Sequence, residues 1–202
     1  MPVITELQVR PVDTVPWDDV RTVFANRGDP ARCWCQFFKL TNVEWNTVPR
    51  EECSQLLREQ IAAPPPAPGV LAYLGDEPVG WCAVEPRPRY SRLKRMPLVA
   101  SGGLDDLDDA SVWAVTCFVV RVGFRKRGVS AALLDGAVEH ARANGAHIVE
   151  AYPVDVAERP GVSSADLYHG PLSLFERAGF TVAARPKPDR AVVQLQLTTT
   201  TT

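Results

Sequence analysis

The residues best suited to chemistry lie in one short turn, Gly123-Phe124-Arg125-Lys126-Arg127-Gly128-Val129-Ser130, which supplies two glycines and three cations. The start of a helix presents unpaired N–H groups and a partial positive charge. Glycine lets backbone approach a ligand closely, and the cations add to the local field. If a helix begins at the end of this turn, the turn predicts a phosphate-binding site.

Two elements must position this turn. Residues 112–120 form a nearly continuous apolar run rich in β-branched and aromatic residues, which predicts a strand buried on both faces. From Val129 onward, apolar residues recur at three- and four-residue spacing, and Asn144-Gly145 supplies a stop, which together predict an amphipathic helix. The sequence therefore predicts a strand, a cationic turn and a helix in succession.

Two common classes of phosphate site are excluded by the spacing. A P-loop requires a lysine directly after its second glycine, and Val129 occupies that place. The turn also contains no G-x-G-x-x-G pattern, so the dinucleotide-binding fingerprint is missing.

The pattern Arg125-x-x-Gly128-x-Ser130, after such a strand and before Leu133-Leu134, resembles the acetyl-CoA motif of the GNAT superfamily of N-acetyltransferases. Serine stands where that motif has glycine or alanine. The resemblance implies an α/β GNAT fold, with a mixed, mostly antiparallel central sheet and helices on both faces. It covers most of residues 70–197.

The resemblance also implies where acetyl-CoA binds. Its pantetheine would lie along the open edge of the strand, and its diphosphate would rest on the turn. The residues implied in cofactor binding are Cys117, Phe118, Val119, Val120, Arg125, Lys126, Arg127, Gly128, Val129 and Ser130.

Length and composition predict one domain. With 202 residues and 46% hydrophobic content, residues 1–197 suit a single GNAT domain, and the threonine run 198–202 is expected to be a disordered tail. The net charge of −2 does not favour nucleic-acid binding. We identify neither a signal peptide nor a membrane span, so a cytoplasmic protein without membrane contact is expected.

Periodicity and turn residues predict the remaining elements. These are an opening strand (4–12), a short helix containing Val20 and Phe24, a helix (50–61), a hairpin (70–74 and 79–84), a strand (146–153), a helix (167–180), and a final strand (191–197) that pairs with the segment after Phe180. The charged connection 85–110 is expected to be mainly a solvated loop.

Catalytic candidates come from the C-terminal half. GNAT proteins typically end the later helix with Leu-Tyr-x-x-x-Gly-Phe, but this chain has Phe175 in the tyrosine place. Tyr168, two predicted helical turns earlier on about the same face, is the nearest substitute as acid. Glu150 and His169 are the candidate bases, and Glu85 is a further carboxylate considered. For Glu150, a structural ion pair is the competing interpretation.

The predicted function is transfer of an acetyl group from acetyl-CoA to a primary amine of a small molecule or peptide, by direct attack in a ternary complex. The alternative is a GNAT-like sensor that binds CoA or acyl-CoA without turnover. The acceptor is not ranked among an aminoglycoside-like antibiotic, a polyamine, an amino acid and a protein N-terminus. The aromatic segment 33–38 either lines the acceptor pocket or packs in the core.

Metal binding and assembly are the remaining questions. The five cysteines are expected to be reduced thiols, and the histidines lack ligand spacing, so no metal site is expected. A homodimer through sheet edges or the first helices is compatible with the sequence, and no residue establishes it.

Overall fold

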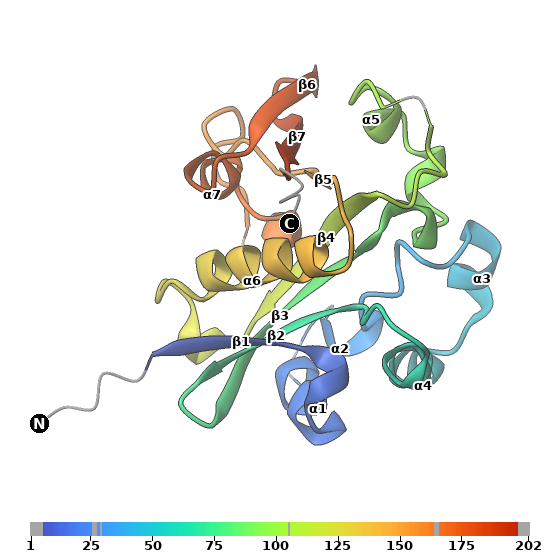
Figure 1. Ribbon diagram of the computed structural model, residues 1–202, viewed down its shortest axis with the longest axis vertical. Coiled ribbons are helices and arrows are strands. Elements are labelled where there is room, and N and C mark those ends of the chain that lie inside the picture. Colours follow the sequence, from blue (N-terminus) through green and yellow to red (C-terminus); the bar gives the residue numbers. More distant parts are fainter. Residues whose placement is uncertain (1–5, 26–27, 29, 105, 164–165, 198–202) are drawn as a thin grey trace, which may run out of the picture.

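A computed structural model describes residues 6–25, 28, 30–104, 106–163 and 166–197. Its centre is a seven-stranded sheet in the order β1-β2-β3-β4-β5-β7-β6 (Figure 1). All neighbouring strands are antiparallel except β4 and β5, which are parallel. This is the mixed, mostly antiparallel sheet that the resemblance implied. The predicted threonine tail, 198–202, lies outside the described residues.

The strands follow the predicted pattern closely. Their bounds are β1 Leu7–Pro11, β2 Gly69–Leu74, β3 Glu77–Pro86, β4 Val112–Val120, β5 Ile148–Ala151, β6 Thr181–Lys187 and β7 Arg190–Gln196. The hairpin of β2 and β3 is confirmed, as is the pairing of the last strand with the segment after Phe180.

The helices divide into a few long ones and many short ones. The α-helices are α1 Trp17–Phe24, α2 Pro30–Cys33, α3 Asn42–Thr47, α4 Arg50–Ala62, α5 Pro97–Ala100, α6 Val129–Ala143 and α7 Leu172–Arg177. The 3-10 turns are η1 Val12–Thr14, η2 Arg87–Arg89, η3 Leu93–Arg95, η4 Val122–Phe124 and η5 Asp166–His169.

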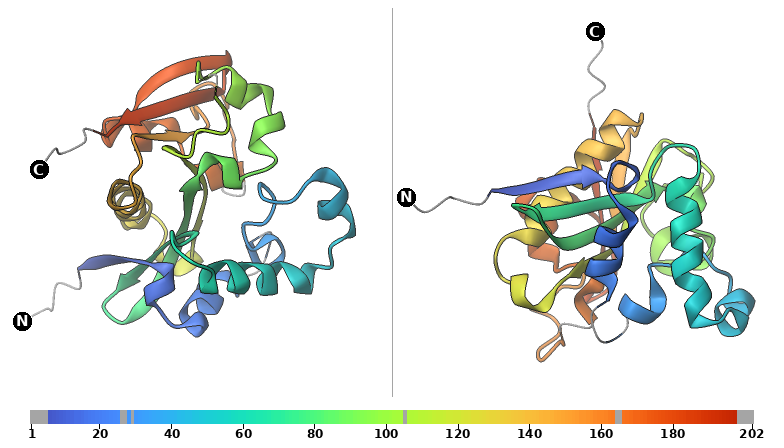
Figure 2. Two further views of the ribbon diagram at one scale, coloured as in Figure 1. Left: turned by 45° about the vertical axis from the view of Figure 1, so that its right-hand side comes forward. Right: turned by 90° about the horizontal axis from the view of Figure 1, so that it is seen from below.

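Alternating side chains of the strands separate the core into two main clusters. On β2, Val70 and Ala72 pack with residues of α6, whereas Leu71 and Tyr73 pack with residues of α1 and α4. Since successive strand residues face opposite sides of a sheet, α6 covers one face and α1 with α4 the other (Figures 1 and 2). The prediction of helices on both faces is confirmed.

Helix α6 lies very close to the first strand. A Cβ atom at Gly136 would stand 2.3 Å from Cγ1 of Val9, which lies on β1. Glycine is therefore required here by close approach. This close approach lets α6 pack tightly against β1.

The prediction of one helix over 167–180 was wrong. The chain forms η5, then turns at Gly170, whose φ is +79°, and only then starts α7 after Pro171. Glycine in the left-handed region followed by proline interrupts a helix. Tyr168 and Phe175 therefore do not share one helical face: Phe175 is fully buried and Tyr168 is 38% exposed.

The connection 85–110 is also more ordered than predicted. It contains the end of β3, two 3-10 turns and α5. Its charge blocks pair with each other, since Lys94 forms an ion pair with Asp108. Arg87 is fully buried, with Nη2 donating to the carbonyl oxygen of Asp106 at 2.6 Å, so a solvated loop is a wrong description of this residue.

Candidate active site

The central feature of the candidate site is an opening in the sheet between β4 and β5. Their register runs from Val112 with Ile148 to Val115 with Ala151. On its other side, β4 stays paired with β3 as far as Val120. Within the described residues, the second half of β4 therefore has no strand partner on the β5 side. The predicted cofactor residues Cys117, Phe118, Val119 and Val120 all lie in this half.

A β-bulge lies at the point where the opening begins. Ala83 pairs with Cys117, but Val84 pairs with Val115, so Thr116 is the extra residue. Its side chain is 1% exposed and lies beside that of Tyr90. A bulge disrupts the regular ladder of hydrogen bonds. It thereby makes backbone groups available to a ligand at this end of the opening.

The cationic turn lies directly after β4 and leads into α6. Gly128 is the N-cap residue with φ +80°, and no side chain caps the helix. The turn residues 125–128 are exposed, and Ser130 is partly buried. Val129 is 3% exposed and packs in the core, so only its backbone faces the turn.

An aromatic ring orders two cations beside this turn. The guanidinium of Arg127 lies 5.5 Å from the ring centre of Phe124, and that of Arg121 lies 5.1 Å from the same ring. Arg121 also forms an ion pair with Glu77 at 2.8 Å. Such contacts reduce the freedom of long cationic side chains before a ligand binds.

Of the predicted catalytic residues, His169 lies beside the bulge. Its imidazole lies near the backbone of Thr116, which acts to raise its pKa, while Nδ1 has no hydrogen-bond partner among the described residues. Its side chain is 2% exposed. Burial and the nearby charge of Arg190 lower the pKa of His169 to about 3. His169 is therefore neutral near pH 7.

Tyr168 completes an aromatic cluster with His169. The two rings are 4.2 Å apart, and Phe38 lies 5.3 Å from His169 and 6.4 Å from Tyr168. Burial raises the pKa of Tyr168, so its hydroxyl remains protonated near neutral pH. The structure thus brings Tyr168 and His169 together, with Phe38 from a distant part of the chain.

Glu150 belongs to a different, fully buried network on β5. Its carboxylate accepts from Tyr152 Oη at 2.7 Å and Gln194 Nε2 at 2.9 Å, and it pairs with Arg87 Nη1 at 3.4 Å. These three donors satisfy the carboxylate of Glu150, as expected if Glu150 forms a structural ion pair. Its role as a base stays a prediction.

A second buried carboxylate occupies the same row of the sheet. Glu85 and Glu150 both pair with Ala114, from opposite sides. Adjacent strands are about 4.8 Å apart, so these two residues lie about 10 Å apart across β4. Glu85 forms ion pairs with Lys39 and with Arg89, the latter at 3.3 Å. Both carboxylates are therefore neutralised by cations.

The aromatic segment 33–38 packs in the core in part, and its lining of an acceptor pocket stays a prediction. Trp34 packs in the core, with its ring 4.8 Å from Phe24 and 5.7 Å from Trp17. Phe38 instead contacts Tyr168 and His169.

Some residues of this site were missed by sequence reasoning. The single hydroxyl of the apolar run 112–120 is Thr116, and that isolation was a usable signal. Arg190 and Lys39 carry no such signal, because only folding brings them beside His169 and Glu85.

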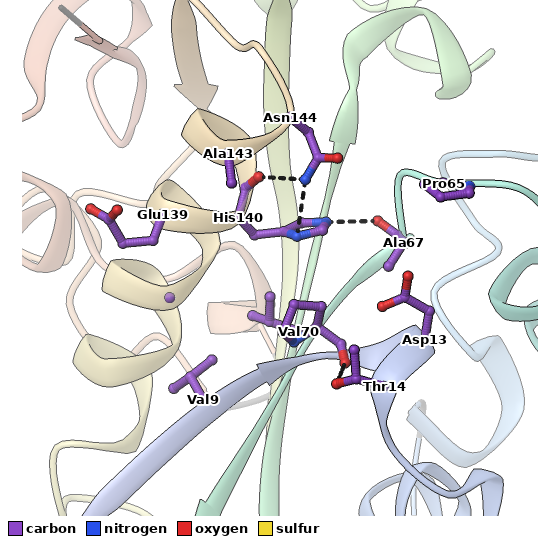
Figure 3. A pocket seen from close by; sticks show the side chains of 12 residues that line it. Val9, Asp13, Thr14, Pro65, Ala67, Val70, Glu139, His140, Ala143 and Asn144 are labelled. Atoms are coloured by element: carbon purple, nitrogen blue, oxygen red, sulfur yellow. Dashed lines mark hydrogen bonds between the residues drawn. The ribbon is translucent and has the colours of Figure 1, made fainter. Parts of the chain in front are cut away.

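A separate hollow of about 500 Å³ lies between β1, the segment before β2 and α6 (Figure 3). His140 projects into it from α6, with Nε2 3.1 Å from the carbonyl oxygen of Ala67. None of the predicted site residues lines this hollow. It is distinct from the opening between β4 and β5.

The described part of the chain has neither a membrane-spanning helix nor a cluster of potential metal ligands. Among these residues, no helix has both the length and the apolar character that crossing a membrane requires. The same residues contain no group of three or more potential ligands placed to hold a metal ion.

Solved structures with the same fold include several acetyltransferases. The putative acetyltransferase yncA from Salmonella typhimurium, solved with its cofactor acetyl-CoA, is 15% identical with a TM-score of 0.54, covering 97% of this chain and 96% of its own. The PaiA N-acetyltransferase from Thermoplasma acidophilum, solved with coenzyme A, is 11% identical with a TM-score of 0.53, covering 95% and 99%. A GNAT-family acetyltransferase from Streptococcus pneumoniae is 16% identical with a TM-score of 0.52, covering 96% and 100%.

Sequence comparison gives the family directly. No curated protein matches the chain. The model of the family described as "Acetyltransferase (GNAT) family" matches residues 34–169, which include the segment 33–38 in large part, the open half of β4, the cationic turn and His169. Since this match spans more than half of the chain and agrees with the fold, the chain belongs to the GNAT family of acetyltransferases.

Proposed function

We propose that this chain is an N-acetyltransferase that moves the acetyl group of acetyl-CoA to a primary amine, by direct attack within a ternary complex. One observation carries the proposal: the unpaired half of β4 leads directly into an uncapped helix start with a cationic, glycine-containing turn. This order offers backbone groups to an extended pantetheine and then N–H groups to a diphosphate. Two proteins of the same fold were solved with acetyl-CoA or CoA.

The turn fits a bulky anionic ligand. Apart from its own chain neighbours, no described residue has an atom within 4 Å of the position that a Cβ of Gly128 would take. Arg125, Lys126 and Arg127 are exposed around it. We assign the diphosphate to the backbone and side chains of residues 125–130, and the pantetheine to residues 117–120.

The attacking amine must lose a proton. A lysine-like amine has a reference pKa of about 10.4, so most of it is protonated at neutral pH. His169 is neutral and offers Nδ1 as an acceptor, but its pKa of about 3 makes it a weak base. We therefore assign His169 the role of passing the proton toward water rather than of retaining it.

The reaction then proceeds at the bulge. The amine nitrogen attacks the thioester carbon, and a backbone N–H of β4 near Thr116 stabilises the oxyanion. The intermediate collapses, the C–S bond breaks, the thiolate of CoA leaves, and the nitrogen releases its extra proton to solvent as the amide forms. Tyr168, protonated and next to His169, is our candidate to return a proton to that thiolate. Because a thiol has a pKa near 8.5, this last step needs the least assistance.

A second function, binding of CoA or acyl-CoA without turnover, is favoured by one observation. Phe175 replaces the tyrosine that the family usually has in the later helix, and its side chain is fully buried between Phe118 and Phe180. Its side chain has no group that can supply a proton. Release of CoA in the presence of amines separates the two functions.

The test has two steps. Calorimetric titration of acetyl-CoA into the wild type, into an Arg125→Ala/Gly128→Glu variant and into an Arg142→Ala control measures binding at the turn. We expect at least tenfold weaker binding in the double variant and no change in the control, since Arg142 lies at the other end of α6. CoA release is then measured with polyamines, amino acids, aminoglycosides and peptides.

Each result has a definite meaning. Equal binding by the wild type and the double variant would contradict the assignment of the turn. Binding without CoA release with every amine would favour the sensor. Release with one amine class would identify the acceptor.

A further inference from the structure

The hollow beside α6 has the size of a small-molecule site. Its volume of about 500 Å³ lies within the range of ligand pockets in proteins. Its residues on α6 run from Gly136, which lies against Val9 of β1, to Asn144, which follows the last turn of the helix. The hollow therefore belongs to the second half of α6, whereas the cationic turn lies at the start of the same helix.

Much of the wall of the hollow is apolar. Val9 and Val70 come from the first two strands, and both pack against the core on the α6 face of the sheet. Pro11, Pro65 and Ala143 continue this apolar surface on the other sides. A hydrocarbon chain placed here would remove apolar area from water, which is favourable.

The imidazole of His140 is held in one orientation at the edge of the hollow (Figure 3). Its Nε2 lies 3.1 Å from the carbonyl oxygen of Ala67, and because a carbonyl only accepts, Nε2 carries the hydrogen. The amide nitrogen of Asn144 donates to the carbonyl oxygen of His140 at 2.8 Å and faces Nδ1 at 3.4 Å. The ring of Trp113 packs edge-on at 5.6 Å. The donors of His140 and Asn144 are therefore engaged within the protein.

The other walls add no donor for a ligand. The hydroxyl of Thr14 donates to the carbonyl oxygen of Pro11 at 2.7 Å. Pro11 and Pro65 have no backbone N–H. None of the lining residues, all of which the structure describes, is a lysine or an arginine. Every side-chain donor of the lining is therefore already engaged.

Acceptors, in contrast, remain open. Asp13 directs its carboxylate into the hollow on the side of Ala67 (Figure 3), and no described residue donates to it. The carbonyl oxygen of Ala67 keeps a second lone pair beside the one that accepts from His140. The end of α6 adds a partial negative charge. Glu139 also lines the hollow, but it forms an ion pair with Arg142.

We propose that this hollow is a binding site for a small alkylammonium ion. The ammonium group lies at Asp13 and the carbonyl oxygen of Ala67, and the hydrocarbon chain lies against Val9 and Val70. The contrast between the engaged donors and the unpartnered carboxylate carries the proposal. An ammonium group brings three N–H donors and a positive charge, which are what the lining lacks. An anionic ligand would meet Asp13 and the end of α6 with like charge.

The test uses three probes with the same number of carbon atoms: butylammonium chloride, n-butanol and sodium butyrate. Each is titrated at constant ionic strength into the full chain labelled with nitrogen-15, and the amide signals are followed by NMR. We expect saturable shifts at Asp13, Ala67 and Asn144 with butylammonium. Its affinity should exceed that of n-butanol by about fivefold, the effect of one partly exposed ion pair, and butyrate should not bind.

Variants test the role of each group. Asp13→Asn keeps the shape of the side chain and removes its charge, so it should reduce the affinity for butylammonium to that for n-butanol. Asp76→Asn, at an exposed position of the turn between β2 and β3, is the matched control and should bind as the wild type does. Ala143→Leu adds volume to the wall and should weaken the binding of both probes. His169→Gln alters the proposed acetyl site and should leave binding in the hollow unchanged.

The outcomes decide the proposal without any measurement of acetyl transfer, so it does not depend on the proposed function. Equal affinities for butylammonium and n-butanol, or equal affinities of the wild type and Asp13→Asn for butylammonium, would overturn the cation site. Shifts confined to the surroundings of His169, and lost in His169→Gln, would also overturn it, because they would place the amine in the acceptor site alone. The absence of any saturable shift would have the same consequence.

Discussion

Replacement of His169 by glutamine should change how the stability of the protein depends on pH. The imidazole is 2% exposed, and burial, together with the charge of Arg190, lowers its pKa to about 3. An unfolded histidine titrates near 6.5. Between these values the unfolded chain binds a proton at this residue and the folded chain does not. The free energy of unfolding must therefore fall as pH falls below 6.5.

The size of the effect follows from the two pKa values. Integration of the linkage relation from pH 7 to pH 5 gives a loss of roughly 2 kcal/mol from this one residue. Glutamine can retain a donor toward the backbone of Thr116 but does not titrate. The His169→Gln variant should therefore lose about 2 kcal/mol less than the wild type over this interval, even if it is less stable at pH 7.

Urea unfolding, followed by tryptophan fluorescence at pH 7, 6 and 5, measures this difference. A His147→Gln variant is the matched control, because His147 is exposed. It should retain the pH dependence of the wild type. Equal losses of stability in the wild type and in His169→Gln would refute the reasoning, because they would show that His169 is solvated or protonated in the folded protein.

Two further predictions concern packing that supports the site. Arg87→Met removes the cation from the fully buried carboxylate of Glu150 and should lower the free energy of unfolding by about 3–5 kcal/mol. Chemical denaturation of this variant and of the double variant Arg87→Met/Glu150→Gln measures the effect. The double variant should be the more stable of the two, and equal or lower stability would contradict the prediction. Gly136→Ala forces a Cβ against Val9 and should lower the free energy of unfolding by about 1–3 kcal/mol, despite the better helix propensity of alanine. Thermal unfolding measures the effect, with Asp135→Ala, at an exposed position of α6, as the control. An unchanged Tm of Gly136→Ala would contradict the close approach of α6 to β1.

Sequence reasoning worked where the signal was local. Three signals depend only on neighbouring residues: the apolar run 112–120, the glycines of the turn and the periodicity from Val129. The structure forms β4, η4 and α6 at these places. It was wrong at 167–180, where the left-handed turn at Gly170 prevailed over the apolar spacing on both sides.

The sequence by itself determined the strand, turn and helix of the motif, because periodicity and backbone preference are properties of consecutive residues. Only the tertiary structure decided where β4 separates from β5, that Thr116 forms a bulge, and that Phe38 contacts His169. These features depend on the register between strands and on contacts across many residues. The packing of the whole core determines them, because the position of each buried side chain restricts the positions of its neighbours. No pattern of consecutive residues contains this information.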